Sequence, residues 1–204
     1  RIKAERLQKV YYSIANLAIS SKDLNSLYSA IHRELSKIIE TRNIYIALCD
    51  NEHKFLNFVY LVDQFIDKSS RAQVKRPFSE GLSEYIIKTG KPLFMQKQEL
   101  LELSASEGFS IFGAIPEVIL CSPLAIGDRI IGVITLQDYQ NPDAYVHTDI
   151  EILHFISNQV ALAIERKRNE EQINTQNARL NAIFESGTHH MWSLNRNYEL
   201  TSFN

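Results

Sequence analysis

The stretch that decides the fold is VILCSPLAIGDRIIGVITLQD, residues 118–138. It holds two apolar runs rich in Val and Ile, 118–126 and 129–138, on either side of Gly127-Asp128. A two-residue connection that begins with glycine is typical of a tight β-hairpin turn. We therefore predict two antiparallel strands joined by this turn.

Side-chain alternation along the second strand assigns its two faces. Ile134 and Leu136 belong to one face, while Val133, Thr135 and Gln137 belong to the other. Helices need an apolar surface to pack against, so we expect them on the face of Ile134 and Leu136. Thr135 and Gln137 are then expected on the opposite face of the sheet.

The sequence before this hairpin alternates between helical and extended patterns. Asp23 is a good helix N-cap, and Gly90 followed by Pro92 ends a short helix. Strands linked by tight turns favour the α+β class, with a largely antiparallel sheet and helices packed on one face. Residue periodicity predicts helices at 2–20, 24–40, 81–89 and 97–106, and strands at 44–48, 55–62, 72–76 and 93–95.

The sequence after the hairpin predicts one long helix. Thr148-Asp149-Ile150-Glu151 has the pattern of a capping box, and no Pro or Gly follows until Gly187. A helix over 148–186 would be roughly 58 Å long. Apolar residues spaced by three and four are typical of a coiled-coil seam. Such seams predict a homodimer through the terminal helices, formed by Leu7, Val10, Ile14 and Leu17 and by Ile156, Ala163, Ile173 and Leu180.

Composition excludes several classes of protein. The 204 residues carry a net charge of −2, which argues against nucleic-acid binding. Two cysteines cannot form a disulfide framework, so we expect a reducing, cytoplasmic location. No apolar run approaches the ~20 residues of a membrane helix, so we expect no membrane contact by this segment. Because the chain starts at Arg1 and ends abruptly at Asn204, we expect it to be part of a longer protein.

Catalytic motifs are missing where they would be needed. Gly127 and Gly132 have P-loop spacing, but the lysine that would hold phosphate does not follow Gly132. Ser83 lacks the Gly-x-Ser-x-Gly elbow, although the open N–H groups at the start of its helix suit an anion. No histidine is followed by an acidic residue, as phosphoacceptor histidines are. We predict no catalytic residue and no required cofactor.

A metal site is also disfavoured. His147, Glu151 and His154 lie at i, i+4 and i+7 on the long helix, but Glu151 is already explained by the capping box. Cys121 falls in a central strand, where a buried structural thiol is expected rather than a redox or tetrapyrrole-attachment site. We therefore predict no bound metal.

Four motifs resemble those of GAF sensor domains. They are RNIYIAL at 42–48, GLSEYIIKTGKP at 81–92, CSPL at 121–124 and QVALAIE at 159–165. The resemblance covers about 20–168 and implies a non-catalytic regulatory domain that binds a small molecule or relays a signal as a dimer. Residues 179–204 resemble the beginning of a PAS domain.

The resemblance implies a domain order. A GAF domain, a helical linker and a PAS domain in succession resemble the sensory half of bacterial histidine kinases or diguanylate cyclases. The expected partners are therefore a second copy of the chain and downstream PAS and kinase, or other output, domains of the same polypeptide. The expected segments are 1–20, a dimerisation helix; 21–168, the GAF domain; 169–186, a linker; and 187–204, a truncated PAS domain.

A candidate pocket combines strand alternation with this resemblance, because GAF ligands usually sit on the face away from the terminal helices. Asn141, Tyr145 and Asp149 fit part of a cyclic-nucleotide pattern, but Pro142 replaces its lysine. Three alternatives stay open: a filled aromatic minicore, a ligand-free dimerisation spacer, and an enzyme like the GAF-fold methionine sulfoxide reductases, which need more cysteines. The candidate pocket residues are Tyr45, Phe58, Tyr60, Gly81, Leu82, Ser83, Tyr85, Phe109, Phe112, Cys121, Thr135 and Gln137.

Overall fold

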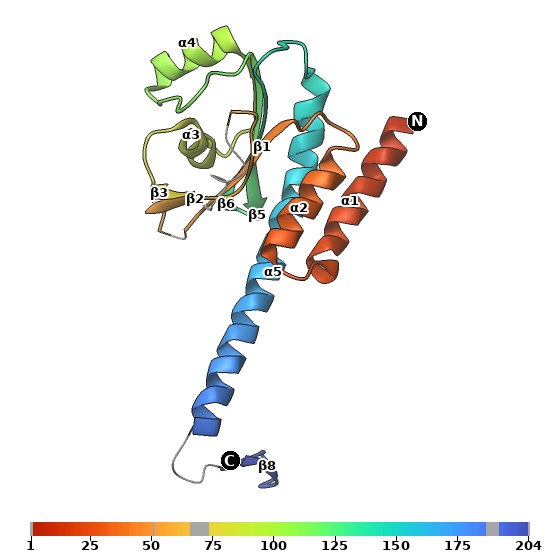
Figure 1. Ribbon diagram of the computed structural model, residues 1–204, viewed down its shortest axis with the longest axis vertical. Helices are drawn as coiled ribbons and strands as arrows, with labels where there is room; N and C mark the ends of the chain where they lie inside the picture. Colours follow the sequence, from red (N-terminus) through yellow and green to blue (C-terminus); the bar gives the residue numbers. More distant parts are fainter. Residues whose placement is uncertain (1, 51, 66–73, 187–191, 204) are drawn as a thin grey trace. The chain divides into compact units, whose positions relative to one another are not determined.

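The computed structural model describes residues 2–50, 52–65, 74–186 and 192–203 (Figure 1). The chain divides into two compact units, 1–165 and 166–204, which are considered separately below.

The first unit is built on a six-stranded antiparallel sheet with the strand order β3-β2-β1-β6-β5-β4. The predicted hairpin is confirmed, because Ile126 pairs with Arg129 across a turn in which Gly127 has a φ of +58°. The α+β class is confirmed as well. The strands are β1 Asn43–Cys49, β2 Phe55–Val62, β3 Val74–Pro77, β4 Leu93–Gln96, β5 Val118–Ile126 and β6 Arg129–Asp138.

Helices lie on both sides of this sheet (Figure 1). On one side are α1 (Ile2–Ser20), α2 (Leu24–Leu35) and the beginning of α5 (His147–Ser186). On the other side are α3 (Leu82–Thr89) and α4 (Lys97–Glu107). The side that carries α1, α2 and α5 is the one expected from the sequence. The short helices α3 and α4 add cover on the opposite face.

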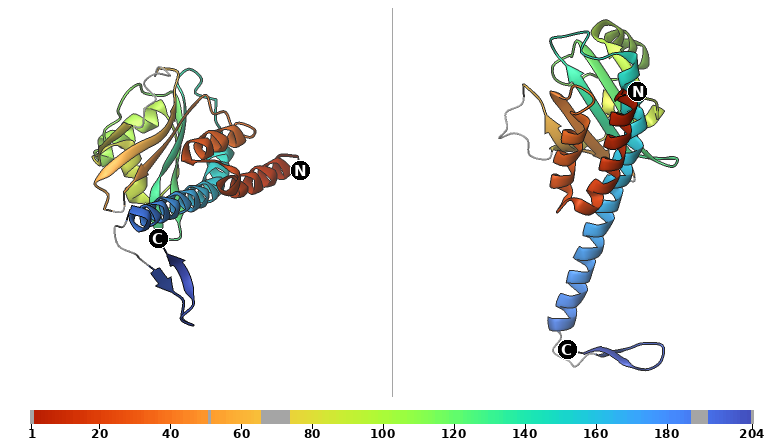
Figure 2. Two further views of the ribbon diagram at one scale, coloured as in Figure 1. Left: turned by 60° about the horizontal axis from the view of Figure 1, so that its bottom comes forward. Right: turned by 90° about the vertical axis from the view of Figure 1, so that its right-hand side faces the viewer.

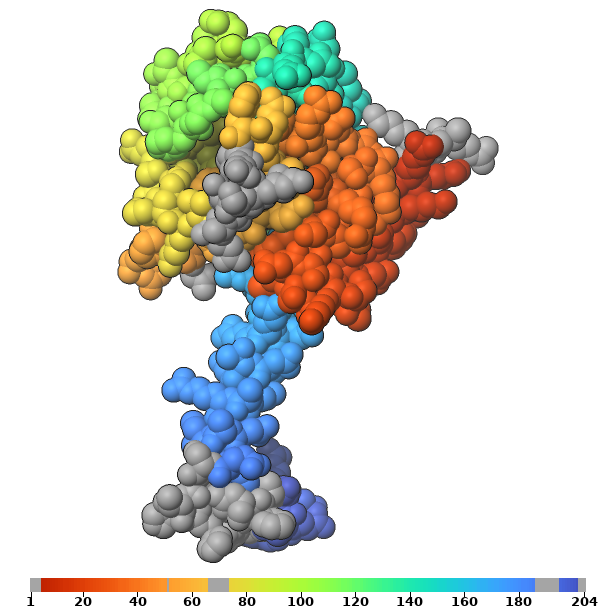
Figure 3. Space-filling view, viewed as in Figure 1, coloured from red at the N-terminus to blue at the C-terminus, as the bar shows by residue number. Residues whose placement is uncertain are grey.

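The alternation along β6 places its side chains as predicted. Ile134 and Leu136 are buried in the core beneath α1, α2 and α5, whereas Val133 belongs to a second core with Ile86 of α3 and Leu100 of α4. The sheet therefore separates two apolar layers. The space-filling view shows the outer surfaces of α1, in red, and α2, in orange, side by side (Figure 3).

Helix α1 uses its apolar stripe inside the domain. Val10, Ile14 and Leu17 are buried in the first core. The Tyr11 ring stacks on Phe155 of α5 with 5.0 Å between ring centroids, so α1 lies beside the start of α5 (Figure 2). These residues are therefore covered by the chain's own sheet and helices.

Two helix ends differ from expectation. Helix α2 ends at Leu35 rather than near residue 40. Helix α5 begins at His147, and the Asp149 carboxylate accepts the Val146 backbone N–H at 3.0 Å. The expected Thr148–Glu151 capping box is thus wrong by two positions, because Asp149 supplies the capping carboxylate at the third helical residue.

The second unit holds the rest of α5 and a two-stranded antiparallel hairpin of β7 (Trp192–Leu194) and β8 (Leu200–Phe203). The Asn195 side chain shapes the turn by accepting the backbone N–H groups of Asn197 and Glu199. This hairpin lies in the stretch 179–204 that resembles the beginning of a PAS domain, and that assignment stays a prediction. Among the described residues, no helix is both long and apolar enough to cross a bilayer.

Candidate functional site

A cavity of about 400 Å³ lies on the α3 face of the sheet. This volume is within the range of small-molecule sites. Its walls come from β1, β2, β3, β5, β6, the start of α3 and the segment 111–116. The lining residues are Tyr45, Phe58, Leu61, Asp63, Phe65, Arg76, Leu82, Ser83, Ile111, Phe112, Gly113, Ala114, Pro116, Ile119, Gln137 and Tyr139.

Half of the candidate pocket residues line this cavity. Gln137 projects from the predicted face of β6, and the aromatic walls include residues of β1, β2 and the 111–116 segment. The cavity therefore lies on the face of the sheet that the alternation argument indicates, and a ligand site there stays a prediction. The candidates that line the cavity are Tyr45, Phe58, Leu82, Ser83, Phe112 and Gln137.

Cys121 belongs to the core on the α3 side of the sheet, Thr135 contacts it, and neither residue lines the cavity. Both are buried, and Thr135 Oγ1 donates to Cys121 Sγ at 3.5 Å. Burial raises the pKa of the Cys121 thiol to about 12, so it stays protonated and unreactive. A bulky residue at 135 would disrupt the core rather than simply fill the cavity.

The remaining candidates have other structural roles. Tyr60 lies on the side of the sheet that carries α1, α2 and α5, where its hydroxyl is 2.9 Å from Nδ1 of His32 in α2. Tyr85 and Phe109 pack against each other with 4.8 Å between ring centroids. Gly81 is the N-cap of α3, and a Cβ atom there would lie 2.6 Å from the Glu84 carboxylate.

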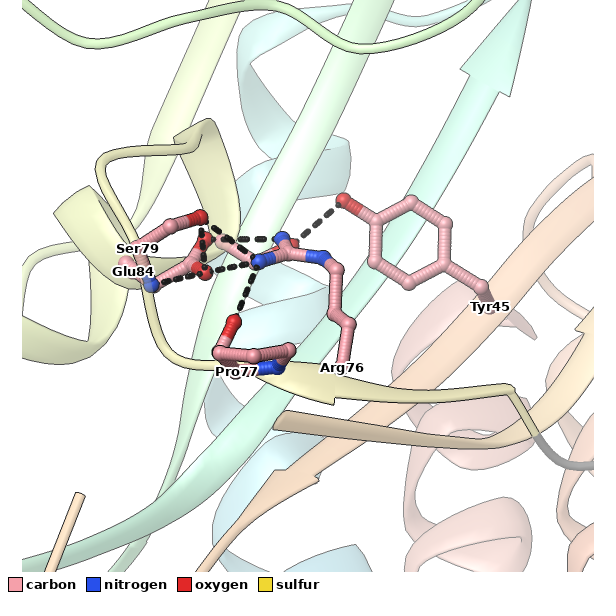
Figure 4. A network of polar contacts seen from close by, with 6 residues as sticks. Tyr45, Arg76, Pro77, Ser79 and Glu84 are labelled. Atoms are coloured by element: carbon pink, nitrogen blue, oxygen red, sulfur yellow. Dashed lines mark hydrogen bonds and ion pairs between the residues drawn. The ribbon is translucent and has the colours of Figure 1, made fainter. Parts of the chain in front are cut away.

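A buried ion pair joins Arg76, which lines the cavity, to Glu84 of α3 (Figure 4). The Arg76 guanidinium donates with both terminal nitrogens to the two carboxylate oxygens of Glu84, one of them at 3.0 Å. The Ser79 backbone N–H also donates to Glu84, at 3.0 Å. Glu84 is fully buried and Arg76 is 26% exposed. Glu84, the third residue of α3, thus places the chain's own carboxylate beside the start of the helix where the sequence suggests that an anion could bind.

The environment of Glu84 determines its charge. Burial by itself would raise the pKa of this carboxyl, but the hydrogen bonds from Arg76 and Ser79 outweigh burial and hold the pKa below its usual range. Glu84 is therefore ionised at neutral pH, and Arg76 is neutralised by it. This part of the cavity offers little net charge to a ligand.

Tyr45 and Ser83 form a neutral polar pair beside the ion pair. The Tyr45 hydroxyl is 3.1 Å from Ser83 Oγ, and Figure 4 shows the Tyr45 hydroxyl directed toward the Arg76–Glu84 group. Burial raises the pKa of Tyr45, so its hydroxyl remains protonated. The hydrogen-bond partner of Ser83 is a phenol rather than a histidine, so this serine has no general base and a nucleophile role has no support.

Asp63 supplies the acidic group at the other end of the cavity. Its Oδ2 accepts from Gln137 Nε2 at 2.9 Å and from the Tyr139 hydroxyl at 2.6 Å, and its Oδ1 accepts the Phe65 N–H at 2.8 Å. Burial, followed by the hydrogen bond to Asp63, raises the pKa of Tyr139. Tyr139 therefore stays protonated and orients the carboxylate.

Sequence reasoning misses the residues that carry most of the polar chemistry. Asp63 lies just after β2 in a stretch whose composition is that of a polar loop, while Arg76 lies on the short edge strand β3. The signal for Tyr139 is present, because this residue extends the alternation of Thr135 and Gln137 by one more step. The bridge from Asp63 to Tyr139 spans 76 positions and leaves no local signal.

Groups that could hold a metal ion are not gathered in the described parts of the chain, where no cluster of three His, Cys, Asp or Glu occurs. His147, Glu151 and His154 instead line a second cavity.

These features fit a family assignment. The family model described as GAF domain matches residues 21–165, and the chain belongs to this family. The chain is 24% identical over 176 residues to the formate hydrogenlyase transcriptional activator FhlA of Escherichia coli (strain K12). That match covers 84% of this chain and 25% of the activator, so the chain spans about a quarter of that relative's length.

Solved structures show the same fold at low sequence identity. The GAF domain of an Acinetobacter phosphoenolpyruvate-protein phosphotransferase superposes with a TM-score of 0.63, at 16% identity over 84% of this chain and 98% of that one. A methyl-accepting chemotaxis protein fragment, residues 122 to 287, superposes with a TM-score of 0.60. The match has 16% identity and covers 75% of this chain and 95% of that one. Free methionine-R-sulfoxide reductase from Neisseria meningitidis also superposes with a TM-score of 0.60. That match has 14% identity and covers 80% of this chain and 91% of that one. These similarities establish the fold, and the family is regulatory in most of its members.

Proposed function

We propose that this GAF domain is a sensory module that binds a small organic molecule in the 400 Å³ cavity and relays its occupancy to an output domain. The observation that carries the proposal is the cavity itself, which combines aromatic walls with a few oriented polar groups. A filled aromatic minicore, the main structural alternative, would not leave such a volume. The other alternative is a dimerisation spacer that binds no ligand. The binding experiments described below distinguish it from a sensory module.

The polar groups of the cavity favour a ligand with N–H donors. Asp63 presents a carboxylate that only accepts hydrogen bonds, and Tyr139 and Gln137 hold it in place. Arg76 is neutralised by Glu84, so the opposite end does not favour an anion. We propose a planar or aromatic body stacked among Tyr45, Phe58 and Phe112, with an amine or amide directed at Asp63.

The output domain is proposed from two sources. The resemblance of 179–204 to a PAS domain favours a histidine kinase, with a PAS domain between the GAF domain and the kinase. The match to a transcriptional activator favours a transcription regulator instead. The two proposals differ in the domain they require, because a kinase needs a dimerisation helix with a phosphoacceptor histidine and a transcription regulator needs a DNA-binding domain.

An enzyme related to the sulfoxide reductases has less support. Such an enzyme would use a reactive thiol near the substrate. Cys49 and Cys121 are both buried, and the raised pKa of Cys121 makes it a poor nucleophile. We expect purified protein to show no turnover of free methionine sulfoxide with a thiol reductant, and measurable turnover would overturn the regulatory proposal.

Binding in the cavity can be tested while the ligand is still unidentified. Ala114 is exposed and lines the cavity, so Ala114→Trp should fill it with little loss of stability. A metabolite present at 100 times its Kd should stabilise the wild type by about 2.7 kcal/mol, or roughly 5–10 °C in melting temperature. Thermal-shift screening should find such a compound for the wild type and no shift for Ala114→Trp.

The control for this experiment is Thr89→Trp, on the far end of α3 and outside the cavity lining. It should retain the ligand-induced shift. A shift that persists in Ala114→Trp and disappears in Thr89→Trp would place the sensed molecule elsewhere. A library that stabilises neither wild type nor variants would favour the ligand-free spacer.

Dimerisation is proposed through α5 rather than through both terminal helices. Val10, Ile14, Leu17, Ile156 and Ala163 are buried within the chain, and Leu7 packs at the edge of the same core. In the second unit, Ile173, Leu180 and Ile183 are more than half exposed on α5. Exposed apolar residues at three-four spacing are covered most simply by the same helix of a second copy.

Charge substitutions on this stripe test the dimer. The double variant Ile173→Glu/Leu180→Glu should be monomeric in sedimentation equilibrium at tens of micromolar, whereas the wild type should be dimeric. Ala178→Glu, on the opposite side of α5, is the matched control and should remain dimeric. Monomeric wild type would refute the dimer for this chain, as would a double variant that still pairs.

A further inference from the structure

A second cavity of about 450 Å³ lies at the other end of α3. Its apolar walls include Tyr85, Phe94 and Ile150, which come from α3, β4 and α5 respectively. β4 is an edge strand of the sheet, so this cavity opens beside the edge rather than over the centre. The volume again suits a small molecule.

The polar rim of the second cavity carries more hydrogen-bond donors than acidic groups. Lys91, His147 and His154 line it together with a single acid, Glu151. Lysine is a cation at neutral pH, and both histidine side chains can donate a hydrogen bond to an anion. A ligand with an apolar body and one carboxylate would match this set of donors.

The imidazole of His154 is held in a defined orientation. Its Nδ1 is 3.1 Å from Ser122 Oγ, and that oxygen is 2.7 Å from Ser157 Oγ. Both serines are fully buried, so the sheet side of the ring is fixed. His154 also lines the cavity, and Nε2, the ring nitrogen that does not contact Ser122, is the one we assign to a ligand.

The two cavities differ in what they touch. The first is lined by Leu82 and Ser83 at the start of α3 and by no residue of α5. The second is lined by Tyr85 and Thr89 further along α3 and also by residues of the first two turns of α5. Since α3 and the start of α5 lie on opposite sides of the sheet (Figure 1), the second cavity is where a ligand would touch both.

We propose that the second cavity is a separate regulatory site for an organic monocarboxylate with an aromatic or branched apolar body. The apolar walls bury the body, and Lys91 with the two histidines binds the carboxylate. Because this site contacts the beginning of α5 directly, its occupancy acts on the helix without passing through the first cavity. This inference goes beyond the proposed function and does not depend on the first cavity being occupied.

Three probes with nearly the same body and different charge test the proposal. Isothermal calorimetry on the full chain would compare indole-3-propionate, indole-3-propionamide and tryptamine. We expect the carboxylate to bind at least about tenfold more tightly than the neutral amide or the amine, because only it gains charge-assisted contacts. Hydrogen exchange should slow in residues 147–154 when the carboxylate is bound.

Variants locate the site. Thr89→Trp, which fills the second cavity, should abolish binding of indole-3-propionate, and Ala114→Trp in the first cavity should leave it unchanged. Lys91→Gln, on the exposed rim, should weaken the binding of indole-3-propionate about tenfold and leave the binding of indole-3-propionamide almost unchanged. No binding of indole-3-propionate, equal binding of all three probes, preference for tryptamine, or loss in Ala114→Trp with retention in Thr89→Trp would each overturn the proposal.

Discussion

Replacing Arg76 with methionine is expected to lower the free energy of unfolding by about 3–5 kcal/mol, because it leaves the buried Glu84 carboxylate without its partner. Glu84 is fully buried and accepts hydrogen bonds from both terminal nitrogens of Arg76. Urea denaturation at pH 7 measures the loss directly.

The double variant Arg76→Met/Glu84→Gln is the matched control. Removing both charges should restore most of the lost stability, because no uncompensated ion is left in the interior. A single Arg76→Met variant as stable as the double variant would show that Glu84 is not held as an ion by Arg76.

The same pair predicts a dependence on pH. The pKa of Glu84 is lower in the folded chain than in the unfolded chain, so its stabilisation is fully present above the unfolded value of about 4.3. It is lost as the pH falls through the lower folded pKa. We expect the double variant to lose less stability than the wild type between pH 5 and pH 3, measured by urea denaturation at each pH.

Replacing Gly132 with alanine is expected to be the most damaging small substitution in the sheet. A Cβ atom at 132 would lie 2.1 Å from the Ala47 carbonyl oxygen and 2.9 Å from Leu48 Cα. Both are backbone atoms of the central strand β1, so they cannot move aside independently. The substitution should lower the free energy of unfolding by more than about 4 kcal/mol, and the variant should be largely unfolded or insoluble.

Gly127→Ala separates this effect from a general cost of replacing glycine. Gly127 has a positive φ of +58°, but nothing lies within 4 Å of the position of its Cβ. That variant should fold and lose only about 1–2 kcal/mol. Comparable denaturation midpoints for the two variants would contradict the close approach of β6 to β1 at residue 132.

The regular elements can be predicted because their signals are local. The 118–138 hairpin follows from two apolar runs and a Gly-Asp turn, and strand alternation places Gln137 on the cavity face. The helical cover of that same face is harder to foresee. Helices α3 and α4 are short, and which side of the sheet they pack on is decided by tertiary contacts.

The polar chemistry of the site depends on pairings between distant residues. Asp63 meets Tyr139 and Arg76 meets Glu84 only once β2, β3, β6 and α3 are assembled. On the terminal helices α1 and α5 the local pattern is clear, but it does not determine the burial of its residues. Ile14 and Ile173 both fit a three-four pattern, but the first is buried in its own domain and the second is exposed. The pattern indicates an apolar face without saying what covers it.

The measurement that tests the sensory account most directly is hydrogen exchange on the full chain, with and without the metabolite that gives the largest thermal shift. The account predicts slower exchange in 43–49, 82–89 and 111–116 around the first cavity, together with altered exchange in residues 147–165 of α5. Ala114→Trp should show neither change. Protection away from the cavity, or unaltered exchange in α5 when the cavity is saturated, would contradict the account.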